Sequence, residues 1–384
     1  MPDYQHPPIE IAGAGPAGLA AALAITTAGR DARIYERRSE VGSRFHGDFQ
    51  GLENWTTEMD VLDEISALGI TTDFEHTPFY EVLGFDPDGV PHRFHSQKPL
   101  FYLVHRGSKE GSLDVALQHQ AMAAGVELRF NEPVRHLPNG GVVTEGPHRA
   151  DVIAAGYLFE TDMADGAYAA VSDRLAPKGY AYLIVHAGQG TLASCLFDDF
   201  HNEHQYVERS LEFFSDKLGV RMQNPRRFGG SGNFSLPQRA HKGNLLYAGE
   251  AAGFQDPLFG FGIRWALLSG ALAGTALAAN QPQRYQRDWK HRLRAYHQTA
   301  ATNRWFYDRL GDRGYRGLMQ RYRKHTDIRE WLHRTYLPKL WKQVWYHLVA
   351  NDRRPLLLTS LEHCSCTWCR CAKQSYRPSP GSQV

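Results

Sequence analysis

Three glycines near the N-terminus have the spacing of a turn that binds phosphate. Gly13, Gly15 and Gly18 form the pattern GxGxxG, and Pro16 and Ala17 lie inside it. Glycines at this spacing let the backbone turn tightly, so that pyrophosphate oxygens can approach the N-terminus of the following helix, where the partial charge is positive. The residues before the turn favour a strand and those after it a helix. The pattern therefore indicates a dinucleotide site more than an ordinary glycine-rich turn.

An acidic residue follows at the distance expected for a ribose ligand. Glu36 lies 18 residues beyond Gly18, at the end of a second strand-like segment, and Arg37 comes next. A carboxylate at this position accepts hydrogen bonds from ribose hydroxyls and disfavours a ligand that carries a 2′-phosphate. The first forty residues therefore predict a strand, helix, strand unit that holds the adenosine half of a dinucleotide.

A second glycine-rich stretch, GNLLYAGEAAGFQDPLFGFG, runs from residue 243 to 262. It resembles the FAD-dependent oxidoreductases of the para-hydroxybenzoate hydroxylase and geranylgeranyl reductase superfamily. Those proteins carry a strand that ends in Gly-Asp, then Ala-Ala-Gly, a Pro, and a Gly-x-Gly that opens a helix. The resemblance implies FAD as the cofactor. The residues that it assigns to the flavin half are Gly249, Glu250, Pro257, Gly260, Phe261 and Gly262.

The same resemblance implies individual roles for some of these residues. Glu250 stands where the family has Asp and would hold the ribityl hydroxyls. Arg106 stands at the position of a family arginine near the ribityl and phosphate groups, although a surface arginine is an equal alternative. The helix that begins at Gly262 would point its positive end at the flavin and stabilise negative charge on the reduced ring.

Within the superfamily, the reductase branch is the closer likeness. Pro177-Lys178-Gly179-Tyr180-Ala181-Tyr182 resembles a motif of that branch on a strand that lines the substrate cavity. We therefore expect reduction of carbon–carbon double bonds in a hydrophobic, isoprenoid or lipid-like substrate, by hydride transfer from flavin N5. Tyr180, Tyr182 and His46 are the candidates for the proton donor. Each of them also fits a packed aromatic or a surface histidine.

Two other functions stay open. The first is an FAD-dependent monooxygenase of an aromatic or secondary metabolite, although Ala154-Ala155-Gly156 stands where hydroxylases show Ala-Asp-Gly. The second is a flavin-loaded redox sensor or a membrane-tethered binding protein. The halogenase signature Trp-x-Trp-x-Ile-Pro does not occur. A nicotinamide or a reduced ferredoxin type of protein remains open as the electron donor.

Four cysteines gather close to the C-terminus. Cys364, Cys366, Cys369 and Cys371 form CxCxxCxC. Four thiolates can hold zinc or an iron–sulfur cluster, but the spacing is typical of neither. Reversible lipidation, redox chemistry and an inert tail remain alternatives, and clustering of this kind does not suggest structural disulfides.

The charge is distributed unevenly along the chain. The net charge is +2, but residues 284–354 hold 18 Lys and Arg against 6 Asp and Glu. Tryptophan, tyrosine and phenylalanine are interleaved with these cations, which suits either an anionic membrane surface or a helical cap with a solvated basic face. A nucleic-acid partner is disfavoured because no binding motif accompanies the charge. Since the N-terminus does not read as a secretory signal, we expect a cytoplasmic protein, with peripheral membrane contact open.

The candidate cofactor and substrate residues require an α/β scaffold of two lobes. We expect a discontinuous Rossmann-like FAD-binding lobe formed by residues 1–75, 99–156 and 236–281. A mixed β-sheet substrate lobe, residues 76–98 and 157–235, is inserted into it. A basic, aromatic helical extension follows over 282–350, and a Cys-rich, partly disordered tail over 351–384.

Overall fold

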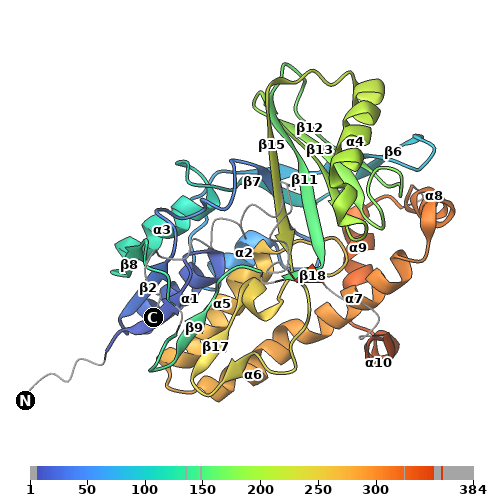
Figure 1. Cartoon of the computed structure of the whole chain (residues 1–384). Helices are drawn as coiled ribbons and strands as arrows, with labels where there is room; N and C mark the ends of the chain where they lie inside the picture. Colours follow the sequence, from blue (N-terminus) through green and yellow to red (C-terminus); the bar gives the residue numbers. More distant parts are fainter. Residues whose placement is uncertain (1–6, 135, 148, 324, 350–355, 358–384) are drawn as a thin grey trace, which may run out of the picture.

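The computed structural model of the chain describes residues 7–134, 136–147, 149–323, 325–349 and 356–357. Figure 1 shows a sheet covered by helices at one end, a tall sheet that rises from it, and C-terminal helices that run along the side of both. The cysteine cluster at 364–371 lies outside the described residues. The arrangement matches the expected α/β fold with an inserted sheet and a helical extension.

The first sheet carries the two glycine-rich turns. Its strand order is β16-β17-β9-β1-β2-β8, and all neighbours pair in parallel except β16 and β17. Parallel strands end at the same edge of a sheet, so the residues after β1, β2, β9 and β17 are brought together there. The strands are β1 (Ile9–Ala12), β2 (Ala32–Glu36), β8 (Glu127–Phe130), β9 (Gly141–Val143), β16 (His241–Lys242) and β17 (Leu245–Tyr247).

Three helices cover this sheet: α1 (Pro16–Thr27), α3 (Leu113–Ala123) and α5 (Ile263–Ala278). α1 is rich in alanine and buried along most of its length, which lets α5 approach it closely. A Cβ at Gly270 or Gly274 of α5 would stand 2.0 or 2.2 Å from a carbonyl oxygen of α1, so only glycine fits at the crossing. This contact positions α1 against α5, and each of these two helices begins at one of the glycine-rich turns.

The inserted lobe is built on a seven-stranded sheet of order β15-β11-β14-β13-β12-β5-β6. Helix α4 (Glu203–Leu218), preceded by the short turn η1 (Phe200–Asn202), packs on one face through the buried Phe214. The strands are β5 (Glu81–Phe85), β6 (Pro91–His95), β11 (Val152–Glu160), β12 (Gly166–Ala170), β13 (Tyr180–His186), β14 (Gln189–Leu196) and β15 (Gln223–Gly232).

Two segments lie in other sheets than the sequence suggested. Residues 152–156 belong to β11 of the seven-stranded sheet and not to the cofactor sheet, since they pair with β14 and β15 over their whole length. Strand β4 (His76–Phe79) pairs with β7 (Phe101–His105), and β3 (Phe49–Glu53) pairs with the other edge of β7. These three strands form a small separate sheet, beside the short helix α2 (Val61–Ser66).

The C-terminal extension is a series of helices that contribute to two hydrophobic core clusters. Tyr285 and Trp289 pack with α1 and α5, and Tyr336 packs with Trp55 and Leu258. The helices are α6 (Pro282–Trp289), the π-helical η3 (Lys290–Arg294), α7 (Ala295–Tyr307), α8 (Gly311–Tyr322), α9 (Ile328–Tyr336) and α10 (Leu340–Val349). The short strand β18 (Leu356–Leu357) pairs with β10 (Arg149–Ala150). Among the described helices, none is both long and apolar enough to cross a bilayer.

Candidate cofactor and substrate site

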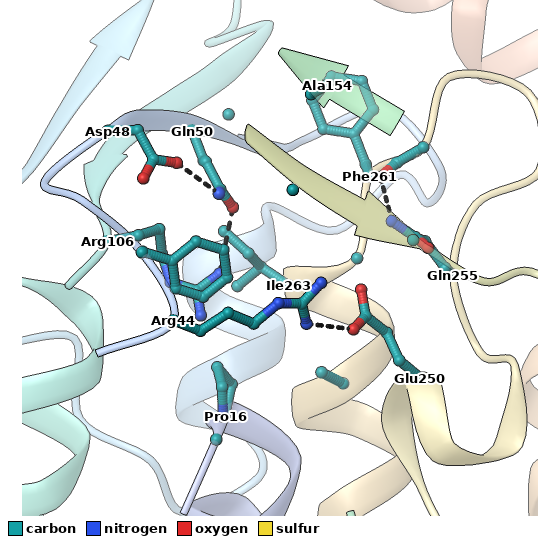
Figure 2. Close-up of a pocket in the computed structure, with 18 of the residues that line it drawn as sticks. Pro16, Arg44, Asp48, Gln50, Arg106, Ala154, Glu250, Gln255, Phe261 and Ile263 are labelled. Carbon is teal, nitrogen blue, oxygen red and sulfur yellow. Dashed lines mark hydrogen bonds and ion pairs between the residues drawn. The ribbon is translucent and has the colours of Figure 1, made fainter. Parts of the chain in front are cut away.

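A cavity of about 450 Å³ lies between the two lobes. One end is formed by the turn after β1 and the end of β2, and the other by the aromatic face of the seven-stranded sheet. The turn after β17, which contains the short helix η2 (Gly249–Ala252), forms part of the wall between them. Figure 2 shows Arg44, Arg106 and Glu250 around the middle of this cavity. A cavity of this shape can take a long ligand whose two ends have different chemistry.

The first glycine-rich turn is shaped for a phosphate group. Gly15 is the N-cap of α1 and offers no side-chain acceptor, so the first N–H groups of the helix are open to an anion. A Cβ added at Gly15 would meet nothing within 4 Å and would project into open space. A Cβ at Gly18 would instead meet the Gly13 carbonyl oxygen at 1.9 Å. Gly15 therefore keeps space free for a ligand, whereas Gly18 is needed for the turn itself.

Glu36 joins the end of β2 to this turn. Its Oε2 accepts a hydrogen bond from the Ala14 N–H at 2.8 Å, and its Oε1 accepts one from the Arg38 N–H at 3.0 Å. A carboxylate has about four lone-pair positions, so both oxygens can still accept hydroxyl donors. The side chain lines the cavity together with Arg37. This geometry fits the ribose of an adenosine.

In the middle of the cavity, Glu250 forms an ion pair with Arg44. The distance from Arg44 Nη1 to Glu250 Oε2 is 2.5 Å, and Arg44 Nη2 donates to the Ser231 carbonyl. Arg44 lies between the first β-unit and the small sheet, so this pair links segments that are 206 residues apart in sequence. Figure 2 shows the guanidinium reaching across to Glu250. A ligand whose hydroxyls are held by Glu250 has to share that carboxylate with Arg44.

Arg106 lines the cavity but is not a surface residue. Its Nε and Nη2 donate to the two oxygens of Asp114 at 2.8 and 2.9 Å, and its Nη1 donates to Gln50 Oε1 at 3.1 Å. Both members of the ion pair are nearly inaccessible to solvent. The Phe45 ring lies 4.0 Å from the guanidinium carbon. Arg106 therefore fixes the loops around the cavity, and its charge is balanced by Asp114, which lines the same wall.

The second glycine-rich turn is held by a buried aspartate. Asp256 accepts hydrogen bonds from the Leu258 and Phe259 N–H groups, at 3.2 and 2.8 Å, and from the Tyr336 hydroxyl at 2.9 Å. Burial raises the pKa of this carboxyl to about 7, although the hydrogen bonds oppose the shift. Asp256 thus shapes the backbone that precedes Gly260 and Gly262.

Gln255 places an unsatisfied acceptor in the same wall. Its Nε2 donates to the Gly260 carbonyl at 2.6 Å, while Oε1 is buried and has no partner among the described residues. A buried acceptor without a partner costs free energy, so the position fits a ligand that brings an N–H or O–H donor. The flavin ring carries such an N–H. Together with the open space at Gly15, this acceptor makes the cavity compatible with FAD.

Residues of the C-terminal extension form hydrogen bonds with the second glycine-rich turn. Arg304 of α7 is 1% exposed and donates to the Leu258 carbonyl at 2.7 Å and to the Lys178 carbonyl. Tyr336 of α9 donates to Asp256, and Leu332 lines the cavity itself. The extension is therefore part of the site. The composition of the extension did not predict these contacts.

The inner half of the cavity is apolar and aromatic. Tyr180, Tyr182 and Ile184 alternate along β13, so all three side chains lie on one face of the strand and line the cavity. Trp55 lies opposite, with its ring centroid 5.0 Å from that of Phe261. Further apolar side chains of the wall include Val82, Leu100, Phe101, Phe228, Phe259 and Leu332.

The three candidate proton donors all line the cavity, but they form different hydrogen bonds. The Tyr180 hydroxyl donates to the Phe259 carbonyl at 2.8 Å, so its proton is already engaged. Burial raises the pKa of the Tyr180 and Tyr182 phenols well above their ordinary value, which keeps both neutral at physiological pH. His46 belongs to the loop that carries Arg44 and donates its backbone N–H to Asp48 at 3.1 Å.

The structure brings most of the predicted residues together. Of the cofactor residues named from the sequence, all but Gly18 and Pro257 line the cavity. Arg44, Asp48, Gln50 and Gln255 were missed. Gln255 lies inside the second glycine-rich stretch and could have been noticed there, whereas the other three carry no local signal. Within the described part of the chain, no group of three or more His, Cys, Asp or Glu could hold a metal ion.

Comparison with known proteins finds one family match near the N-terminus and solved structures of similar fold. Residues 16–61 match the family model described as flavin containing amine oxidoreductase. No curated protein matches the chain at a significant level. The fold is similar to that of a geranylgeranyl bacteriochlorophyll reductase-like protein from Thermoplasma acidophilum, at 17% identity and a TM-score of 0.68, over 92% of this chain and 98% of that one.

Two further flavoproteins share the fold. The flavin-dependent brominase Bmp2 is 16% identical with a TM-score of 0.60, over 89% of this chain and 98% of that one. The p-nitrophenol 4-monooxygenase PnpA from Pseudomonas putida is 16% identical with a TM-score of 0.54, over 82% and 97%. At these identities the likeness shows the fold alone. The fold and the family-model match together support the FAD-dependent oxidoreductase superfamily that the glycine-rich stretches resembled.

Proposed function

We propose that the chain is an FAD-dependent oxidoreductase that reduces a carbon–carbon double bond in a hydrophobic, isoprenoid or lipid-like substrate. The observation that carries the proposal is the continuity of one cavity, which leads from the two glycine-rich turns into a half lined by aromatic and aliphatic side chains. An apolar wall of this kind binds a hydrocarbon by removing its surface from water. Bound FAD, once reduced by an electron donor, would supply the hydride for the reduction.

The chain's own residues take defined roles in this proposal. The open N-terminus of α1 and Glu36 bind the adenosine and pyrophosphate half, and Glu250 holds the ribityl hydroxyls. Trp55, Phe259 and Phe261 exclude water from the reacting half of the cavity. Since the proton of Tyr180 is engaged with a carbonyl, delivery of a proton to the substrate falls to Tyr182, or to His46 if Tyr182 is not required.

The second candidate is an FAD-dependent monooxygenase. The similarity in fold to a p-nitrophenol 4-monooxygenase favours it, and both activities need the same cofactor. The apolar wall also suits an aromatic substrate. We rank this candidate second because the chain lacks the Asp of the hydroxylase Ala-Asp-Gly motif at residues 154–156.

An assay of the products distinguishes the candidates. The protein loaded with FAD is reduced chemically without oxygen and mixed with a polyunsaturated isoprenoid alcohol or diphosphate. The proposal predicts a product that has gained two hydrogen atoms per double bond, detected by mass spectrometry. An oxygenated product that forms only in air with a nicotinamide donor would establish the monooxygenase instead. Bound FAD without turnover under either condition would favour a sensor or binding protein.

Tyr182→Phe separates the proton donor from the cofactor site. The variant keeps the aromatic packing, so FAD binding is unchanged, while the rate of reduction falls at least about a hundredfold. Tyr80→Phe is the matched control, since Tyr80 is 41% exposed and does not line the cavity. An undiminished rate in Tyr182→Phe would show that another group supplies the proton.

A further inference from the structure

Helix α10 presents an apolar stripe to solvent. Trp341, Val344 and Leu348 are spaced by three and four residues, so they lie along one side of the helix, with Leu340 beside them. The exposed Leu337 precedes the helix. Leu340 is 78% exposed, Leu348 72%, Val344 56% and Trp341 52%. We call Leu337, Leu340, Trp341, Val344 and Leu348 the α10 face. Most surface helices turn such a stripe toward the core, so the α10 face needs an explanation.

The side of α10 next to this stripe is attached to the protein. Trp345 stacks on Phe306 of α7 at a centroid distance of 5.7 Å, and the Lys342 carbonyl accepts the Thr302 hydroxyl at 2.8 Å. Figure 1 shows α10 at the edge of the molecule, below α7. The exposed Phe306 and Leu310 extend the apolar surface from α10 to the end of α7. The stripe is thus held outward by the same contacts that anchor the helix.

The charge around the α10 face is positive. Residues 331–350 contain no Asp or Glu. Of their three cations, Arg334 pairs with Glu330, and Lys342 is buried and donates to the Thr335 carbonyl, which leaves Lys339 as the exposed cation beside the helix. Lys339 is exposed at the start of the helix, and Arg309 lies 3.7 Å from the ring of Trp305, which packs on Trp345. An apolar face with tryptophan and phenylalanine, bordered by cations, has the composition of a helix that lies in the headgroup region of an anionic bilayer.

We propose that the α10 face inserts into the surface of a membrane that contains anionic phospholipids. A second copy of the chain fits less well, because it would bring the same positive charge to the contact. Residues 351–384 fit less well for the same reason, since they hold five Lys and Arg against two Asp and Glu. The proposal does not depend on the reaction proposed above. A hydrocarbon substrate would be available from the same surface.

Co-flotation of the full chain with vesicles tests the proposal. We expect the protein to float with vesicles of phosphatidylcholine mixed with phosphatidylglycerol and far less with phosphatidylcholine alone. The variant Leu340→Ser, Val344→Ser and Leu348→Ser should lower the partition coefficient about tenfold or more. Lys339→Gln should lower it about fivefold, and added salt should weaken binding of the unaltered protein.

A matched variant controls for the loss of apolar surface in general. Met59, Val90 and Met122 are exposed but lie outside the C-terminal extension, so their replacement by Ser should leave vesicle binding unchanged. Circular dichroism and urea unfolding establish that each variant is folded. Failure of the full chain to float with either kind of vesicle overturns the proposal, and so does equal binding by the α10 variant. A dimer that the α10 variant abolishes, without vesicle binding, would assign the face to a second copy.

Discussion

Gly15 and Gly18 belong to one motif, yet an added Cβ would meet different surroundings at the two positions. At Gly15 it would project into open space, and at Gly18 it would collide with the Gly13 carbonyl oxygen. The backbone at Gly15 has a φ of −78°, which any residue can adopt. We therefore expect a substitution at Gly15 to affect ligand binding and a substitution at Gly18 to affect folding.

Gly15→Ala should weaken FAD binding about tenfold or more and lower the free energy of unfolding of the flavin-free protein by less than about 1 kcal/mol. Gly18→Ala should lower that free energy by about 1–3 kcal/mol, because the turn has to move to admit the methyl group. Urea unfolding measures the stability, and quenching of FAD fluorescence on titration measures the affinity. Unchanged FAD affinity in Gly15→Ala would place the pyrophosphate elsewhere.

The buried Asp256 should make the stability depend on pH. Burial raises its pKa in the folded protein to about 7, from an ordinary value of 3.8, so the folded state holds a proton between about pH 4 and 7 that the unfolded state has lost. The associated stability is present at low pH and is lost as the pH rises through 7. His297 acts in the opposite direction over part of this range, since burial lowers its pKa to about 4.

Asp256→Asn isolates the contribution of Asp256, because His297 is present in both proteins. The free energy of unfolding of the natural chain should fall relative to that of the variant by up to about 1 kcal/mol per pH unit between pH 5 and 7, and the difference should level off above about pH 8. Urea unfolding of both proteins at each pH provides the comparison. Parallel curves would show that Asp256 is ionised in the folded protein throughout.

At the scale of elements, helix α7 holds the flavin-side turn from outside. Arg304 is buried and donates to the carbonyl groups of Leu258 and Lys178 and, at 2.7 Å, to Asp308. Its guanidinium carbon lies 4.2 Å from the ring of Phe197. The turn from Asp256 to Gly262 thus takes its position from an element that follows it in sequence.

Arg304→Met should lower the free energy of unfolding by about 3–5 kcal/mol, because it leaves Asp308 and two carbonyl groups without their partner. FAD binding should weaken as well, since the turn loses its support. Arg287→Met is the control in the same extension. Arg287 pairs with Asp288 but its side chain is 74% exposed, so the change should stay within about 1 kcal/mol. If Arg287→Met is as unstable as Arg304→Met, the loss of stability does not come from the buried contacts of Arg304.

Local sequence patterns predicted single strands and helices, because each of them is formed by consecutive residues. The strand at Ile9–Ala12, the helix after the first glycine-rich turn and the helix after the second are found where their patterns placed them. The ion pair of Arg44 with Glu250 joins residues 206 positions apart, and no local pattern encodes such a contact. The transfer of residues 152–156 to the seven-stranded sheet likewise depends on pairing with distant strands.

At the scale of the whole molecule, the cofactor sheet, the inserted sheet and the C-terminal helices surround one cavity. The sequence divided the chain into a cofactor lobe, a substrate lobe and an extension, but the extension supplies Leu332 to the cavity wall and Tyr336 to the flavin-side turn. Trp289 and Tyr336 pack inward, as expected for the alternative of a helical cap. The alternative of a membrane surface is now confined to the α10 face, as a proposal.

The central claim is that the two glycine-rich turns bind the two halves of one FAD. Titration of the flavin-free protein with FAD, followed by visible absorption and by the fluorescence of the flavin, tests it most directly. We expect yellow protein with one FAD per chain, and weaker binding in both Gly15→Ala, at the pyrophosphate end, and Glu250→Ala, at the ribityl end. Colourless protein that takes up no added FAD would show that the two turns do not form an FAD site.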